Sequence, residues 1–139
     1  MSIVVDCSVT LSWYIPDEVN GRTRAVLEYV ADKGAVTPFH WRAEMANGLL
    51  AAARRKRIER DFISTAFERL DLLPIADDLE GMEQTGSVAF GLAEEHTLTI
   101  YDAIYLETAM RRGLPLATFD TALQRAAQTA GVPVFQTAP

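Results

Sequence analysis

Two periodicities alternate along the chain. Short runs of consecutive apolar, often β-branched residues are typical of buried strands. Between them lie longer segments in which apolar residues recur every three or four positions, as on one face of a helix. We expect strands at residues 3–5, 35–37, 72–75, 116–119 and 132–135. Pro74 makes the third of these a weak strand and favours a sheet edge.

Helix signals fill the intervals between these strands. We expect helices at residues 22–33, 38–52, 59–70, 77–95, 100–112 and 121–130. Pro38 suits a first helical turn, Asp77 or Asp78 would cap the fourth helix, and Gly113 would end the fifth. Because strands and helices alternate from end to end, the pattern predicts an α/β fold. Its parallel sheet of about five strands would carry helices on both faces.

Length and composition agree with one globular domain over residues 1–139. The apolar share is 49% and the charged share 23%, which argues against disorder. No apolar run approaches the roughly 20 residues that cross a bilayer, and the first residues lack the basic segment of a signal peptide. The single cysteine, Cys7, permits no internal disulfide. We therefore expect a cytoplasmic protein without a membrane partner.

The formal net charge of −6 argues weakly against nucleic acid as a partner. The positive charge is unevenly distributed, however, because five of the 13 basic residues fall within seven positions: Arg54, Arg55, Lys56, Arg57 and Arg60. This basic run would either guide a nucleic-acid backbone or form a solvated helix end.

Asp6 follows the first predicted strand, near the middle of the expected sheet. A charged group there is costly to desolvate unless it is paired or holds a metal. In open parallel sheets, ligands bind beyond the carboxyl ends of the strands. Ser8, two residues on, would hydrogen-bond the same carboxylate. The alternative for Asp6 is a cap of the turn that follows it.

Three further acids have similar alternatives. Glu44 lies beside the apolar stripe of its helix, with Asn47 one turn on as a supporting partner. Asp102 falls in the first turn of its helix, where it would serve a site or a capping box with Thr99. Asp120 ends the fourth strand and would either join the same site or cap the last helix.

Together these acids suggest a metal centre. Mg²⁺ and Mn²⁺ prefer oxygen ligands and are bound by a few carboxylates with water and substrate phosphate. Such ions activate water and stabilise the leaving oxygen of a phosphodiester. Clustered acids also raise one another's pKa, so they would titrate as a coupled set.

With these residues in view, the chain resembles the PIN-domain nucleases and, within them, the VapC-type toxins. Four segments carry the resemblance in order along the chain: residues 4–8 (VVDCS), 44–47 (EMAN), 98–103 (LTIYDA) and 116–120 (LATFD). No single segment is specific, but the order and spacing match over essentially the whole chain.

The resemblance implies a three-layer α/β/α sandwich and RNA cleavage that depends on Mg²⁺ or Mn²⁺. It assigns the acidic metal site to Asp6, Glu44, Asp102 and Asp120, with Ser8 and Thr118 as polar support. It also implies a homodimer and a small VapB-like antitoxin whose tail wraps the toxin. We expect in-line hydrolysis of RNA, with Asp6 and Asp102 as the principal metal ligands.

Other functions remain open at this point. A phosphotransfer domain of the receiver or haloacid-dehalogenase kind shares an Asp after the first strand. The latter needs a second acid where this chain has Ser8, and both need a late lysine that Lys33 and Lys56 do not supply. A PIN-domain nuclease without a toxin role is another alternative. So is a non-catalytic binding module, in which the acids are caps and the basic run docks a partner.

Overall fold

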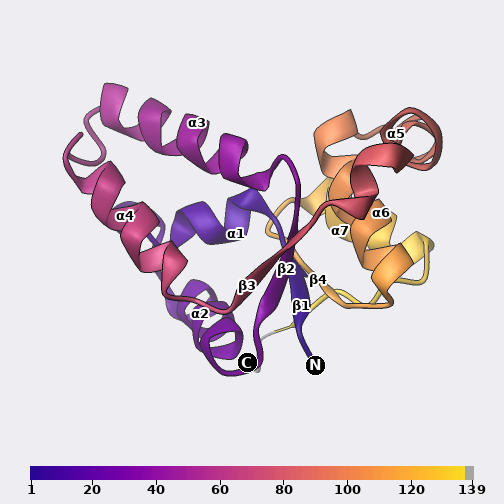
Figure 1. Ribbon diagram of the computed structural model, residues 1–139, viewed down its shortest axis with the longest axis horizontal. Helices are drawn as coiled ribbons and strands as arrows, with labels where there is room; N and C mark the ends of the chain where they lie inside the picture. The colour runs from indigo at the N-terminus through magenta and orange to yellow at the C-terminus, as the bar shows by residue number, and fades with distance from the viewer. Residues whose placement is uncertain (137–139) are drawn as a thin grey trace.

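A computed structural model describes residues 1–136 and shows strands and helices in alternation (Figure 1). The elements are β1 (Ile3–Val5), α1 (Cys7–Ser12), η1 (Pro16–Glu18), α2 (Gly21–Lys33), β2 (Ala35–Pro38), α3 (Trp41–Arg54), α4 (Phe62–Asp71), β3 (Ile75–Asp78), η2 (Glu80–Gln84), η3 (Thr85–Ala89), α5 (Phe90–His96), α6 (Ile100–Arg112), β4 (Leu116–Ala117) and α7 (Thr121–Thr129). Within residues 1–136, no helix is long and apolar enough to cross a membrane.

The four strands form one parallel sheet in the order β3-β2-β1-β4. β1 lies in its interior, where Val4 pairs with Val36 of β2 on one side and with Leu116 of β4 on the other. Because the strands are parallel, their carboxyl ends meet at one edge of the sheet, and Asp6 follows the interior strand there. The predicted α/β fold with a parallel sheet is confirmed.

Alternating side chains of β1 divide the core into two clusters. Ile3 and Val5 pack with Val26 and Val30 of α2 on one face. Val4 faces the larger cluster, which includes residues of α3, α4, α6 and α7. Figure 1 shows α3 and α4 as a pair on the left of the sheet and α6 and α7 on the right. Helices thus cover both faces, as in a three-layer α/β/α sandwich.

α6 is the most deeply buried helix of the fold. Every residue from Ala103 to Ala109 is buried, and α6 contacts both β1 and β2. Seven consecutive buried residues extend over all sides of a helix, so this part of α6 lies inside the molecule. Its first turn is therefore held in a fixed position beside the carboxyl ends of the strands.

The fifth predicted strand is reduced to one bridge, between Leu116 and Val134. The Leu116 N–H donates to the Pro133 carbonyl at 2.9 Å, and the Phe135 N–H donates to the Leu116 carbonyl at 2.8 Å. Pro133 has no N–H with which to extend this pairing. The segment keeps the place of a fifth strand beside β4, but residues 1–136 contain four strands rather than five.

Several boundaries also differ from the prediction. β4 ends at Ala117 rather than residue 119, and α4 begins at Phe62 rather than residue 59. The third strand begins at Ile75 rather than residue 72, because Pro74 cannot donate to the ladder; it is an edge strand, as expected. Pro38 ends β2 instead of starting a helix, and α3 begins at Trp41. The helix predicted at residues 77–95 is a 3₁₀ turn, a π turn and the short helix α5 in succession.

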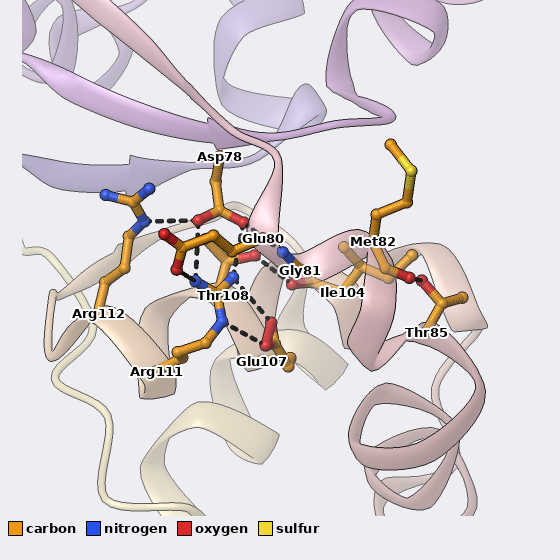
Figure 2. Close-up of polar contacts among 10 residues, drawn as sticks. All are labelled: Asp78, Glu80, Gly81, Met82, Thr85, Ile104, Glu107, Thr108, Arg111 and Arg112. Atoms are coloured by element: carbon orange, nitrogen blue, oxygen red, sulfur yellow. Dashed lines mark hydrogen bonds and ion pairs between the residues drawn. The ribbon is translucent and has the colours of Figure 1, made fainter.

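An ion network joins the end of β3 to the end of α6 (Figure 2). Asp78 is fully buried and accepts hydrogen bonds from Arg111 at 2.6 and 2.9 Å and from Arg112 at 2.7 Å. Arg111 also binds Glu107 at 2.7 Å. Asp78, one of the two predicted caps, accepts the Gly81 N–H at 3.0 Å. Burial would raise the pKa of Asp78, but these donors outweigh it and lower the pKa to about 2.

Gly81 leaves the space that this network occupies. A Cβ atom at Gly81 would lie 3.0 Å from both Arg111 Nη2 and Asp78 Oδ2, whereas a Cβ at Gly86 in the same segment would meet nothing within 4 Å. We expect Gly81→Ala to lower the free energy of unfolding by about 1–3 kcal/mol through overpacking. The control Gly86→Ala should be neutral or slightly stabilising. Urea denaturation at pH 7 measures both, and equal values for the two variants would contradict the role of Gly81.

Candidate active site

Asp6 lies at the carboxyl end of β1 with only 3% of its surface exposed. Its N–H donates to the Ala117 carbonyl of β4 at 3.1 Å, which continues the sheet pairing. The chain then turns into α1, and Asp6 Oδ1 accepts the Val9 N–H at 3.1 Å as the N-cap. The cap considered as the alternative for Asp6 is thus present, but it involves only one of the two carboxylate oxygens.

Two hydroxyl groups hold the Asp6 carboxylate between the ends of β1 and β4. Ser8 Oγ donates to Asp6 Oδ1 at 2.7 Å and accepts the Phe119 N–H at 3.2 Å. Thr118 Oγ donates to Asp6 Oδ2 and accepts the Asp120 N–H at 3.0 Å. A hydroxyl has one proton to donate, and both hydroxyls donate it to Asp6. The contact predicted for Ser8 is confirmed, and Thr118 makes an equivalent one.

Asp102 and Asp120 lie at the starts of two helices near this edge of the sheet. Asp102 is half-buried in the first turn of α6, where Thr99 Oγ accepts its N–H at 3.1 Å and caps the helix. Asp120 is exposed, and its Oδ1 accepts the Leu123 N–H at 2.9 Å as the N-cap of α7. As with Asp6, the cap of Asp120 uses one oxygen.

Glu44 projects from the first turn of α3, and two donors meet at one of its oxygens. Tyr105 OH donates to Glu44 Oε1 at 2.6 Å, and His40 Nε2 lies 3.1 Å from the same atom. Asn47, the partner that helical spacing proposed, is exposed and has no hydrogen bond to Glu44 in the described chain. Side chains on a helix lean toward its N-terminus, so Glu44 leans toward His40 and away from Asn47.

His40 and Tyr105 are the two polar neighbours of the acids that the sequence analysis missed. No motif along the chain includes His40, so the sequence alone indicates a structural or surface residue there. Its spacing of four from Glu44 at a helix start was the one local signal available. Tyr105 lies 61 residues from Glu44 in the chain, and only the packing of α6 against α3 brings the two together.

Like charges raise the pKa of two of the acids. Burial raises the pKa of Asp6 to about 6 against the hydrogen bonds it accepts, and the charge of Asp102 adds to the rise. Burial also raises the pKa of Asp102, followed by the charges of Asp120 and Glu44. For Glu44, burial acts in the same direction, but its two side-chain donors outweigh it and lower its pKa. The structure thus brings all four predicted acids into one electrostatic neighbourhood.

The donor chemistry of these acids fits a hard divalent cation. Within residues 1–136, none of the four forms an ion pair with a lysine or arginine. In that same range, no three His, Cys, Asp or Glu side chains are arranged to hold a metal ion together. Mg²⁺ is commonly bound by one or two carboxylates, with water completing the shell. Within residues 1–136 the acids therefore do not form a cage of three or four direct ligands, and an ion here would be held by one or two carboxylates and water.

The basic run lies at the far end of α3 from Glu44. Ten residues of helix separate Glu44 from Arg54, which is about 15 Å. Arg57 pairs with Asp17 at 2.5 Å and Glu18 at 2.9 Å, so it fastens the chain after α3 to η1. All five members of the run are exposed, and four of them form no ion pair within residues 1–136: Arg54, Arg55, Lys56 and Arg60. The structure does not bring this run to the acids.

Three aromatic side chains, Trp13, Tyr14 and Trp41, could either stack on nucleic-acid bases or pack in the core. Trp41 is 2% exposed, and its Nε1 donates to Thr10 Oγ at 2.9 Å. Tyr14 is 7% exposed, and Trp13 donates to the Thr23 carbonyl at 3.1 Å. These contacts favour packing over base stacking for all three rings.

Sequence comparison places the chain beside known proteins. The family described as "PIN domain" matches residues 3–128. "Ribonuclease VapC3" of Pyrobaculum aerophilum is 29% identical over 123 residues, which cover 88% of this chain and 92% of that protein.

A solved structure is similar over nearly the whole chain. It is the crystal structure of PAE2754 from Pyrobaculum aerophilum, with a TM-score of 0.66 and 21% sequence identity. The match covers 91% of this chain and 84% of that chain. At this identity the likeness establishes the fold.

Removing the charge of Asp6 should stabilise the metal-free protein at high pH. Asn keeps the helix cap. Because the folded pKa of Asp6 is about 6 and its ordinary value is 3.8, the folded state takes up a proton between these values that the unfolded chain does not. Wild-type stability therefore falls as the pH rises through this window. We expect Asp6→Asn to be more stable by about 1–3 kcal/mol at pH 8 and equal to wild type near pH 3.5.

Urea denaturation in EDTA at several pH values measures this difference. Asp32→Asn, a change at an exposed acid of α2, is the control and should show no such window. An Asp6→Asn protein that is less stable than wild type at pH 8 would show that burial of this charge is not a cost.

Proposed function

The chain belongs to the PIN domain family, and from that premise we propose that it is a ribonuclease that uses Mg²⁺ or Mn²⁺. In this proposal it hydrolyses RNA phosphodiester bonds and is the toxin of a type II toxin–antitoxin pair. The name of its relative, "Ribonuclease VapC3", supports the choice of RNA as substrate.

One observation carries the proposal: the carboxylates at the carboxyl end of the sheet repel one another. The pKa of Asp6 and that of Asp102 are both raised by burial and by neighbouring acids. A fold that keeps like charges together without a basic partner is less stable for it, and such perturbed groups concentrate at functional sites. A divalent cation and a phosphate would turn this repulsion into binding.

The proposed roles follow from which oxygens are available. Asp6 and Asp102 would hold the cation. Asp6 is buried at the end of β1, and the charge of Asp102, in the first turn of α6, acts on Asp6. When bound, the cation would neutralise phosphate charge and lower the pKa of the attacking water. Glu44 and Asp120 each have an oxygen outside the hydrogen bonds described above. These oxygens would orient water at the scissile phosphate, with Ser8 and Thr118 fixing Asp6.

The same proposal includes the partners and the location of the protein. A small VapB-like antitoxin would restrain the enzyme, because a basic side chain of its tail would compete with the cation for the uncompensated acids. A homodimer and a cytoplasmic location belong to the proposal as expectations from the family resemblance.

Loss of a single proposed ligand should abolish cleavage. We expect Asp6→Asn and Asp102→Asn to lower the rate of RNA hydrolysis on the order of 100-fold or more, while Asp32→Asn keeps the wild-type rate. Cleavage of a labelled RNA by purified protein with Mg²⁺, Mn²⁺ or EDTA measures this directly. Growth after induced expression, with and without co-expression of a candidate VapB-like antitoxin, tests the toxin role.

Two results would overturn the proposal. One is wild-type protein that cleaves no RNA with either ion. The other is an Asp6→Asn variant that still arrests growth. Cleavage without any growth effect would instead favour a PIN-domain nuclease that is not a toxin.

Replacing the members of the basic run that form no ion pair in residues 1–136 should have a different effect from replacing Arg57. If the run guides the RNA backbone, replacing Arg54, Arg55 and Arg60 by Gln should weaken RNA binding uniformly across sequences. The slope of log affinity against log salt should then fall by about 2. Arg57→Gln should mainly lower stability, because it removes the pairing with Asp17 and Glu18. Fluorescence anisotropy with Asp6→Asn protein measures binding without cleavage, and an unchanged salt slope would leave the run as a solvated helix end.

A further inference from the structure

We propose that His40 and Tyr105 are positioning residues that hold one oxygen of Glu44 and thereby direct the other toward the cation. The inference rests on the proposed metal-dependent function and adds two residues to it. Neither residue would touch substrate or cation. Both would act through the Glu44 carboxylate.

Tyr105 is a permanent donor to Glu44. Its ring is 1% exposed, and its hydroxyl donates to Glu44 Oε1 at 2.6 Å. Burial, followed by the charge of Glu44, raises the pKa of Tyr105 far above its ordinary value, so the phenol keeps its proton. Because α6 is buried nearly all round, Tyr105 offers this proton from a fixed place.

His40 approaches the same oxygen from the start of α3. Its Nε2 lies 3.1 Å from Glu44 Oε1 and 3.0 Å from the Tyr101 carbonyl oxygen. Both neighbours are acceptors, so Nε2 must carry the hydrogen. Two aromatic neighbours fix the His40 ring further. It stacks on the Tyr101 ring with the centroids 6.1 Å apart, and its centroid lies 4.8 Å from that of the Tyr105 ring.

The other ring nitrogen shows that His40 is held for its Nε2 contacts. Nδ1 is buried and has no hydrogen-bond partner within residues 1–136, and the side chain is only 10% exposed. A buried polar atom without a partner lowers stability. The fold accepts this loss at the one histidine that contacts a carboxylate of the candidate site.

Two donors on Oε1 fix the orientation of the whole carboxylate. Oε2 has no hydrogen bond in the described part of the chain, and the Glu44 side chain is 30% exposed. Without the two donors, Glu44 would rotate freely, as helical glutamates at a surface do. With them, Oε2 keeps one orientation and stays free to accept, and the charge of Glu44 acts on Asp102. Partners of this kind commonly change metal affinity about 10–100-fold when removed.

Tyr105→Phe tests the inference, and Tyr101→Phe is its matched control. Both variants remove one hydroxyl from α6, but the Tyr101 hydroxyl is on an exposed ring and only its backbone carbonyl contacts His40. We expect Mn²⁺ affinity, measured by calorimetry without RNA, to fall about 10-fold in Tyr105→Phe and to stay unchanged in Tyr101→Phe. RNA cleavage by Tyr105→Phe should need more Mn²⁺ but approach the wild-type rate at saturation.

A double-mutant cycle separates positioning from a general structural role. Once Glu44→Gln has removed the carboxylate, adding Tyr105→Phe should cause no further loss of Mn²⁺ affinity. His40→Phe, which keeps the ring but removes the donor, should weaken Mn²⁺ binding, and His40→Gln should restore part of it. Thermal denaturation of each variant confirms that the proteins compared are folded.

The outcomes distinguish this inference from the function on which it rests. If Asp6→Asn abolishes Mn²⁺ binding and cleavage while Tyr105→Phe behaves like Tyr101→Phe, the positioning role is overturned and the nuclease stands. Additive losses in the cycle also overturn it. If wild-type protein binds no Mn²⁺ and cleaves no RNA, both proposals fail together.

Discussion

The burial of one carboxylate, that of Asp6, is the constraint on which the candidate site depends. β1 is paired on both sides, so the residue at its end cannot turn to solvent. Ser8 and Thr118, one after each of two neighbouring strands, donate their only hydroxyl protons to it. These side-chain bonds add to the backbone pairing of β1 with β4 and keep Asp6 an acceptor. The Asp6 carboxylate therefore belongs both to the candidate site and to the hydrogen bonding that joins the ends of β1 and β4.

Glu44 and Asp120 divide their two oxygens between the fold and the site, whereas both oxygens of Asp6 accept hydrogen bonds from the fold. Asp6 Oδ1 and Asp120 Oδ1 cap helices, and Glu44 Oε1 accepts from two side chains. A carboxylate has lone pairs on both oxygens, so a structural bond to one leaves the other able to accept. Helix cap and metal ligand, which the sequence posed as alternatives, are thus compatible for Asp120. They are compatible for Asp6 through the second lone pair of Oδ2, since the first accepts the Thr118 hydroxyl. Rigid placement by the first oxygen is what makes the second one useful.

The sequence predicted what depends on local pattern and missed what depends on packing. The apolar run before Asp6 and the spacing to Ser8 were sufficient for the strand end and its hydrogen bond. Pro74 correctly indicated an edge strand, but the predicted start of that strand lies three residues before its observed start at Ile75. The contact of Glu44 with Tyr105 spans two helices that are distant in the chain, so no local spacing contains it.

Two acidic groups in this molecule show opposite ways of managing charge. Around Asp78, the guanidinium groups of Arg111 and Arg112 supply the positive charge from within the chain, and the pKa of Asp78 falls. Around Asp6, burial and then the charge of Asp102 raise the pKa instead, and no lysine or arginine pairs with it in residues 1–136. Burial is a cost in both places. In the first the chain offsets that cost itself, and in the second the compensating charge must come from solution or from a partner. That difference is the physical reason to assign chemistry to the Asp6 group and structure to the Asp78 group.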